Sequence, residues 1–208
     1  MSKEINAEKI LEFLHEAGKL KTTIRFGANS IIRGDSSADH SWRLALMTFL
    51  VAEELDLKID RYRALKIALV HDLAEAIAGD TDARLVHSKI VSKEEKDRKE
   101  NEAIKKLSGF LPPRQKKEIL GLWREYNDKS SAEAKFITAL DKLETQAKII
   151  EEGYKVYDAP DLIATYGNKE VGNFPALLGI LKIVKKKIRA EFKKGKIPWK
   201  KEYELRKK

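Results

Sequence analysis

The chain has 208 residues, enough for one sizeable hydrophobic core, so a single domain is the default expectation. It contains no cysteine, which excludes disulfides and thiolate metal ligands and leaves His, Asp and Glu to bind any metal. No stretch approaches the roughly 18 apolar residues of a membrane span, and the first residues lack the apolar core of a signal peptide. We therefore expect a soluble, cytoplasmic protein.

The net charge of +9 is unevenly distributed along the chain. Residues 182–208 hold 13 Lys or Arg and 3 Asp or Glu, whereas residues 1–181 hold 29 basic and 30 acidic residues. We therefore separate a basic C-terminal tail, residues 196–208, from the rest. The Lys and Glu content, with only two Met, resembles that of hyperthermophile proteins, in which exposed charges form ion-pair networks. The basic C-terminus is interpreted first as such a solvated surface, and second as a contact for nucleic acid or another polyanion.

Helical periodicity dominates the chain and alternating strand patterns are scarce, which predicts an all-α fold. Three Ser-x-x-acidic patterns, at Ser36, Ser92 and Ser130, predict helix starts by capping. Pro160 and Gly167 mark an irregular or short helical stretch. The predicted helices cover about 6–17, 36–55, 60–78, 92–107, a segment that starts at 112–113 and includes Trp123, 132–152, and 175–194. Together these elements predict a single-domain helical bundle.

Two of these helices carry expectations about burial. In the helix over 6–17, the apolar side chains Ile10, Leu11 and Leu14 are expected to point inward. The helix over 36–55 is apolar on nearly every side, which is typical of a central, buried helix.

Histidine and aspartate occur at unusual places in the predicted core. Only four His are present, and His40 and His71 fall in the most hydrophobic helices. Asp72 follows His71 within an apolar run, and Asp141 lies in another. A carboxylate buried there is costly unless a cation or a full set of hydrogen bonds compensates it. Singly, each His could be a core or capping residue and Asp141 a partner of a neighbouring Lys, but together they form a mixed N/O ligand set suited to a divalent ion.

Glu75 and the remaining histidines refine this hypothesis. On a continuous helix Glu75 lies four residues after His71 and three after Asp72, so it shares their face. A metal lowers the pKa of bound water from about 15.7 toward 7, and a nearby carboxylate then transfers the proton. His87 and His15 are interpreted as ordinary surface residues.

The order His40, His71-Asp72, Asp141 resembles the H…HD…D pattern of the HD-domain phosphohydrolase superfamily. Longer strings are closer to one branch, the HD-domain 5′-nucleotidases (the HDDC2/YfbR-like group). These strings are Ser37-Ala38-Asp39-His40, Ala68-Leu69-Val70-His71-Asp72-Leu73-Ala74-Glu75 with Gly79-Asp80, Ser131-Ala132-Glu133-Ala134-Lys135-Phe136, and Leu140-Asp141-Lys142-Leu143-Glu144. The resemblance spans residues 11–155 and makes residues 1–195 an HD phosphohydrolase domain. It implies an all-α fold, a divalent metal, a homodimer and hydrolysis of nucleoside 5′-monophosphates, often deoxy ones.

The resemblance also assigns roles to individual residues. His40, His71, Asp72 and Asp141 become ligands of one divalent metal ion, which could be cobalt, manganese, nickel, zinc or magnesium. Glu75 takes the place of the family's catalytic glutamate. The Arg25-Phe26 pair matches residues that orient the phosphate and flank the base, with Arg25 offering a planar fork of donors. The implied substrate contacts are Arg25, Phe26, Asp80, Thr81, Asp82 and Ala83. Relatives often carry a proline within the 80–83 segment, so the resemblance does not specify the sugar or base.

Two alternatives remain beside the 5′-nucleotidase. One keeps the site and changes the substrate to a deoxynucleoside triphosphate, a cyclic nucleotide or an alarmone. The other is a metal-containing protein that binds nucleic acid through residues 182–208.

Overall fold

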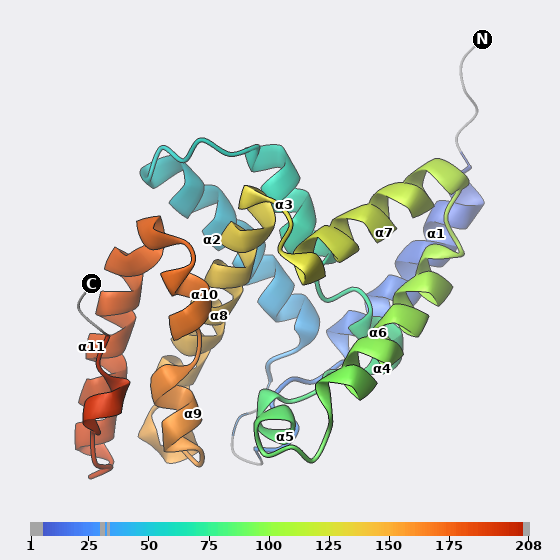
Figure 1. The fold of residues 1–208 in the computed structure, drawn as a ribbon. Helices are drawn as coiled ribbons and strands as arrows, with labels where there is room; N and C mark the ends of the chain where they lie inside the picture. The colour runs from blue at the N-terminus through green and yellow to red at the C-terminus, as the bar shows by residue number, and fades with distance from the viewer. Residues whose placement is uncertain (1–5, 30–31, 33, 206–208) are drawn as a thin grey trace.

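The computed structural model describes residues 6–29, 32 and 34–205, and within them the chain is an assembly of helices (Figure 1). The described part contains no strand, only an isolated bridge between Ile24 and Ser36. The helices are α1 Ala7–Ala17, α2 Ser37–Glu54, α3 Arg61–Val70, α4 Glu75–Ala78, α5 Ala83–His87, α6 Lys93–Ser108, α7 Pro113–Asp128, α8 Ala132–Glu152, α9 Pro160–Thr165, α10 Asn168–Gly172 and α11 Leu178–Lys194. Short 3₁₀ turns lie at Gly18–Lys21, Tyr154–Val156, Pro175–Leu177 and Lys201–Tyr203. The predicted all-α class is confirmed.

Helix α8 forms the centre of the fold, in contact with α2, α3, α7, α10 and α11. Its side chains Phe136, Ile137 and Leu140 are completely buried, and each such burial stabilises the fold by about 1.5–3 kcal/mol. The helix covers the predicted residues 132–152, but its capping serine lies one residue later than the predicted Ser130. Its cap is Ser131, whose Oγ accepts from the Ala134 N–H and donates to Glu125 of α7, a contact that the local pattern at Ser130 does not contain.

Helix α2 begins where its sequence predicts. Ser36 Oγ accepts from the Asp39 N–H at 3.1 Å, and Asp39 Oδ2 accepts from the Ser36 N–H at 3.0 Å, which is a reciprocal capping box. This start orients the first turn so that Ser37 and His40 are buried. Because α2, α3 and α8 contact one another pairwise, residues at the ends of α2 and α3 meet the middle of α8.

The prediction of a single helix over 60–78 is wrong in one respect, because residues 71–74 form a turn that divides it into two helices. Helix α3 ends at Val70 and α4 starts at Glu75. Across the interruption the hydrogen bonds tighten, since the Leu73 and Glu75 N–H groups bond the carbonyls three residues earlier. His71 and Asp72 therefore lie in a turn rather than inside a helix. Gly79, with φ of 76°, then ends α4 as expected.

The burial expected for two helices is also corrected. In α1 the buried residue is Phe13, while Leu11 and Leu14 are exposed. Helix α2 buries Leu44, Thr48 and Ala52 on one side only. Its other side leaves four large apolar side chains 43–66% exposed: Trp42, Leu46, Phe49 and Leu50. An apolar sequence on all sides cannot reveal which side lacks a neighbouring helix.

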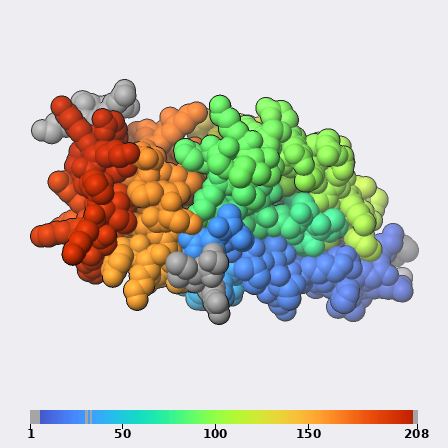
Figure 2. Space-filling model, turned by 90° about the horizontal axis from the view of Figure 1, so that it is seen from below, coloured from blue at the N-terminus to red at the C-terminus, as the bar shows by residue number. Residues whose placement is uncertain are grey.

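Helix α11 and the segment after it lie at the opposite end of an elongated molecule from α1 (Figures 1 and 2). Residues 196–205 fold back along α11, where Tyr203 is buried and its ring packs edge-on against Phe192. Lys185 of α11 is buried too, and its Nζ donates to the carbonyls of Ala164 and Tyr203. None of the described helices is both long and apolar enough to cross a membrane.

Candidate active site

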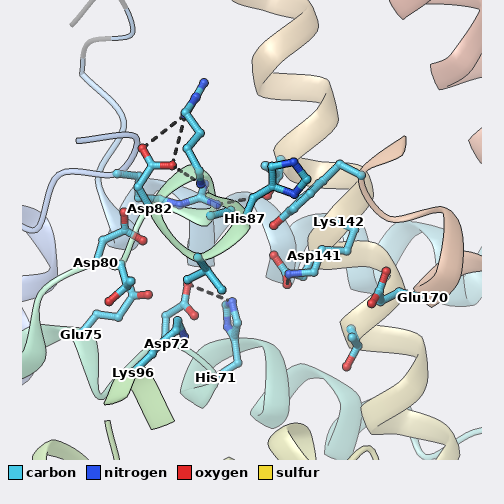
Figure 3. A pocket seen from close by; sticks show the side chains of 18 of the residues that line it. His71, Asp72, Glu75, Asp80, Asp82, His87, Lys96, Asp141, Lys142 and Glu170 are labelled. Carbon is cyan, nitrogen blue, oxygen red and sulfur yellow. Dashed lines mark hydrogen bonds and ion pairs between the residues drawn. The ribbon is translucent and has the colours of Figure 1, made fainter. Parts of the chain in front are cut away.

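His71 and Asp72 line a cavity of about 540 Å³ (Figure 3). His40 is buried directly against them. The Nε2 atoms of His40 and His71 face each other at 3.2 Å. Asp72 Oδ2 lies 3.0 Å from His71 Nε2 and 3.6 Å from His40 Nε2. Asp141 approaches from α8, with Oδ1 3.3 Å from His40 Nε2. The structure thus brings the four residues predicted as ligands together.

The chemistry of this cluster fits a divalent cation. Among the described residues, His40, His71 and Asp72 form a group whose potential ligand atoms all lie within 4.8 Å of one another. Ligands that bind one ion at 2.0–2.2 Å lie about 3 Å apart, close to the separations found here. His71 Nδ1 lies 2.8 Å from the Ala68 carbonyl oxygen, which can only accept, so the free lone pair of His71 is on Nε2.

The charges of the cluster compensate one another. Burial and Arg25 lower the pKa of His40, but hydrogen bonds with Asp141 and Glu144 outweigh them and raise it to about 9. Burial raises the pKa of Asp72, yet the His71 and His40 imidazoles outweigh it and hold that pKa below its usual range. A proton on His40 offsets these carboxylates in the absence of a cation, and a bound cation would have to replace that proton, since metal ligation requires the neutral imidazole.

Asp141 is oriented by two donors: Lys142, the neighbouring lysine that the sequence offered as a partner, and Tyr126, which the sequence did not single out. Tyr126 of α7 donates its hydroxyl to Asp141 Oδ2 at 2.7 Å, and Lys142 Nζ lies 2.8 Å from the same oxygen. Burial raises the pKa of Asp141, but Lys142 and His40 outweigh it and hold it well below its ordinary value. Gly167, with φ of 77°, allows the turn between α9 and α10 to close over Lys142, because a Cβ there would lie 2.6 Å from the Lys142 Cβ.

Glu75 and Asp80 form an acidic wall beside the cluster (Figure 3). Glu75 is buried, and Ser37 donates its hydroxyl to Glu75 Oε2 at 2.5 Å. Burial, together with the negative charges of Asp72 and Asp80, raises the pKa of Glu75 well above its ordinary value. Burial likewise raises the pKa of Asp80 to about 6, although Arg25 opposes the shift. Both carboxyl groups therefore keep a proton to a higher pH than an exposed carboxyl group does.

Arg25 lies on the loop before α2 and faces the same cavity. Its Nη1 lies 3.0 Å from Asp35 Oδ2, and its Nη2 donates to Thr145 Oγ1 of α8 at 3.1 Å. Burial opposes its charge, but Glu144 and the cluster carboxylates outweigh it and raise the Arg25 pKa. Phe26 also lines the cavity, and two guanidinium groups lie near its ring, with Arg25 Cζ 5.1 Å and Arg84 Cζ 5.7 Å from the ring centre.

The 80–83 segment lines the cavity, but Asp82 has local partners. Its carboxylate caps α5 by accepting from the Arg84 N–H at 2.8 Å, and it also accepts from the Ala28 N–H at 3.0 Å. Thr81 and Ala83 are half-buried in the wall. Of the other histidines, His15 is exposed, and His87 is exposed at the cavity rim.

Sequence reasoning missed several residues of the site. Glu144 is buried one turn after Asp141 and accepts from His40 Nδ1. The criterion that singled out Asp141, a carboxylate within an apolar helix, also applies to Glu144. Tyr126 and Lys96 also reach the cavity, and no local pattern distinguishes them from surface residues.

Comparisons with known proteins agree with this geometry. The sequence model of the HD domain family matches residues 17–171, more than half of the chain. The chain is 39% identical over 140 residues to human 5′-deoxynucleotidase HDDC2, a match that covers 66% of this chain and 65% of the human protein, slightly less than two thirds of its length. It is 36% identical over 181 residues to the Danio rerio protein of the same name, covering 84% of this chain and 86% of that one.

A solved structure extends the likeness to the whole fold. It is a crystal structure from Magnetospirillum magnetotacticum MS-1 described as a predicted metal-dependent phosphohydrolase. The two chains are 28% identical with a TM-score of 0.74, over 93% of this chain and 96% of the other.

Proposed function

Since the chain belongs to the HD domain family, we propose that it is a metal-dependent 5′-nucleotidase that hydrolyses nucleoside 5′-monophosphates, above all deoxynucleotides, to nucleoside and phosphate. One observation carries this proposal: two imidazole nitrogens and carboxylate oxygens converge at one cavity that Arg25 and Glu75 also line. The relatives named 5′-deoxynucleotidase support the substrate class.

In this proposal His40, His71, Asp72 and Asp141 hold one divalent ion. Such an ion would supply a Lewis acid for the phosphoryl oxygens and a lowered pKa for the attacking water. The mixed N/O donor set accommodates cobalt, manganese, nickel, zinc or magnesium, so the donor types alone do not select the metal.

Arg25 is the proposed phosphate ligand. Its guanidinium is held at the cavity by Asp35 and Thr145, so its orientation is set before a substrate arrives. Charge-assisted hydrogen bonds from a guanidinium to phosphate oxygens are short and directional. Phe26 would flank the base, and the segment Asp80, Thr81, Asp82 and Ala83 would form the wall beside the sugar.

Glu75 is the proposed proton-transfer group. Its raised pKa favours a protonated carboxyl, which can donate to the leaving 5′-oxygen as water adds to phosphorus. Ser37 holds one oxygen of this carboxyl. The products are a nucleoside with a free 5′-hydroxyl and inorganic phosphate.

A screen of nucleotides against metals tests the proposal. After chelator treatment, phosphate release would be measured for ribo- and deoxynucleoside monophosphates, deoxynucleoside triphosphates and cyclic nucleotides with each of the five ions. We expect release from deoxynucleoside monophosphates that requires an added ion. Turnover of triphosphates or cyclic nucleotides alone would contradict the monophosphate assignment, and no turnover of any nucleotide would contradict the hydrolase.

The exposed apolar side of α2 supports a homodimer as a further part of the proposal. Trp42, Leu46, Phe49 and Leu50 follow helical spacing and form one continuous stripe. Monomeric proteins rarely expose large contiguous apolar patches, and a two-fold interface uses the same patch on both copies. Two antiparallel copies of α2 crossing at Leu46 would place Trp42 of one opposite Leu50 of the other.

Light scattering coupled to size-exclusion chromatography tests this interface. Leu46→Glu is expected to convert a dimer into a monomer, whereas Leu11→Glu, at another exposed apolar position, should leave the mass unchanged. A monomeric unmodified protein, or equal effects of both changes, would contradict it.

We further propose that residues 1–195 form the catalytic domain, with 196–208 as the basic tail, and that the enzyme acts in the cytoplasm. The residues assigned to the site all lie between positions 25 and 145, which supports this division.

A further inference from the structure

Glu144 is a buried charge that the proposed reaction does not use. Its side chain lies in α8, one turn after Asp141, and is only 1% exposed. A carboxylate in such a place is strongly destabilising unless it is paired and hydrogen-bonded. Its partners are therefore informative about its role.

Three nitrogen donors from two other segments surround the carboxylate. His40 Nδ1 is hydrogen-bonded to Oε2, and Arg25 Nη1 lies 3.6 Å from the same oxygen. Arg43 of α2 donates from Nε to Oε1 at 2.6 Å. One carboxylate thus contacts both a proposed metal ligand and the proposed phosphate ligand.

The contact with His40 determines which ring nitrogen is free. An ionised carboxylate can only accept, so His40 Nδ1 carries the hydrogen and, in the neutral ring, the lone pair is on Nε2. That nitrogen faces His71 Nε2, Asp141 Oδ1 and Asp72 Oδ2. His71 is held in the same way by the Ala68 carbonyl. Partners of this kind orient the histidines of metal sites and raise their basicity.

We propose that Glu144 is a positioning residue that holds His40 with Nε2 toward the metal and keeps Arg25 beside it through the same oxygen. This deepens the proposed function and rests on it for the presence of a metal. Glu144 itself touches neither the ion nor the substrate.

A structural role through Arg43 is the alternative, and the chain offers a matched control for it. Arg43 also donates from Nη1 to Glu151 Oε2 at 2.7 Å, about two turns further along α8 than Glu144. Glu151→Gln weakens the anchoring of Arg43 without touching His40. Glu144→Gln removes the charge, and because the amide nitrogen cannot accept, either His40 or Arg43 loses its acceptor.

The test is metal binding without nucleotide. Calorimetric titration with Mn²⁺ and the visible absorption of Co²⁺ would be compared for the unmodified protein and both variants. We expect Glu144→Gln to weaken binding 10–100-fold and to alter the Co²⁺ spectrum, and Glu151→Gln to stay within about twofold. Unchanged binding in Glu144→Gln, or equal losses in both variants, would overturn the proposal.

A second measurement needs no variant, in case Glu144→Gln does not fold. In the unmodified protein loaded with Zn²⁺, long-range ¹H–¹⁵N NMR spectra report which nitrogen of each imidazole carries hydrogen. We expect His40 to be protonated on Nδ1, and protonation on Nε2 would overturn the proposal.

These readouts separate the two proposals. If the protein hydrolyses nucleotides but its metal affinity is unchanged in Glu144→Gln, the proposed function stands and the positioning role of Glu144 is excluded. If metal binding depends on Glu144 but no nucleotide is hydrolysed, the positioning role stands and the proposed function is excluded. An unmodified protein that binds no metal contradicts both.

Discussion

Two parts of the molecule bury charge, and they do so differently. At the junction of α2, the turn 71–74 and α8, two imidazoles and several carboxylates face one another, with arginines and a lysine behind them. At the other end, Lys185 of α11 is buried without an ion pair among the described residues, and its ammonium donates to two backbone carbonyls. Both arrangements are polar and both lie inside the protein.

The difference is in how the charges are satisfied. The Lys185 ammonium joins α9 and the C-terminal segment to α11, and burial simply lowers its pKa to about 8. In the cluster, the pKa values of neighbouring carboxyl groups shift in opposite directions: that of Glu75 is raised and that of Asp72 is lowered. Such divergence is typical of groups with different tasks in a reaction. Buried charge alone therefore does not indicate a site, whereas lone pairs that converge on one point do.

The largest expected effect is that of Asp72→Ala. Removal of a proposed ligand should abolish metal-dependent phosphate release, a loss greater than the 10–100-fold typical of outer-sphere partners. It should also remove the rise in melting temperature caused by added metal, since only a bound ion stabilises the fold. Phosphate assays and thermal denaturation with and without metal would check both. A variant with full activity would contradict the assigned ligand set.

Glu75→Gln tests whether Glu75 transfers a proton while other residues of the cluster bind the metal. The amide keeps the shape of a protonated carboxyl but cannot transfer the proton, so kcat should fall about 10²–10⁴-fold. Metal affinity should change little, because Glu75 contacts Ser37 rather than the imidazoles. Steady-state kinetics and metal titration would be measured together. A weaker metal affinity with an unchanged kcat would mean that Glu75 is a metal ligand and not the proton-transfer group.

Arg25→Lys, also at the cluster, is expected to lower kcat/KM by less than Glu75→Gln lowers kcat. A lysine keeps the charge but cannot bond Asp35 and Thr145 while presenting a fork to phosphate. Loss of a hydrogen bond to a charged group costs about 1.5–3 kcal/mol, which corresponds to about 10–100-fold in kcat/KM. The kinetics with a deoxynucleoside monophosphate would show this, and an unchanged kcat/KM would exclude a phosphate contact.

Lys185→Met removes the buried ammonium group of α11, at the other end of the molecule, and should change the stability of the fold but not its activity. Burial lowers the pKa of Lys185 from 10.5 to about 8, so between these values the unfolded chain binds more protons than the folded one. Lys185 therefore contributes a stability that increases as pH rises through this window. The increase relative to Lys185→Met should be on the order of 1 kcal/mol, because solvent screens part of the charge.

Urea denaturation of both proteins from pH 7.5 to 10 would measure the increase. Phosphate release should be equal in the two proteins at a pH where both are folded. Parallel pH profiles would show that the ammonium of Lys185 is not desolvated in the folded state.

The amino-acid sequence by itself determined the helical class and the identity of four residues that meet at the cluster: His40, His71, Asp72 and Asp141. Caps such as Ser36 act over three residues, and the scarcity of His makes His40 and His71 conspicuous within apolar runs. Asp72 and Asp141 were found because charged groups inside such runs need a reason to be there. Each of these signals is contained in a few neighbouring residues.

Only the tertiary structure decided the interruption at residues 71–74, the exposed side of α2 and the partners of Glu144. The cap at Ser131 depends in the same way on Glu125 of another helix. These features arise from contacts between residues far apart in the chain, as between His40 and Glu144. Periodicity reports that a helix has an apolar side, but packing determines which side is covered and which carboxylate meets which imidazole.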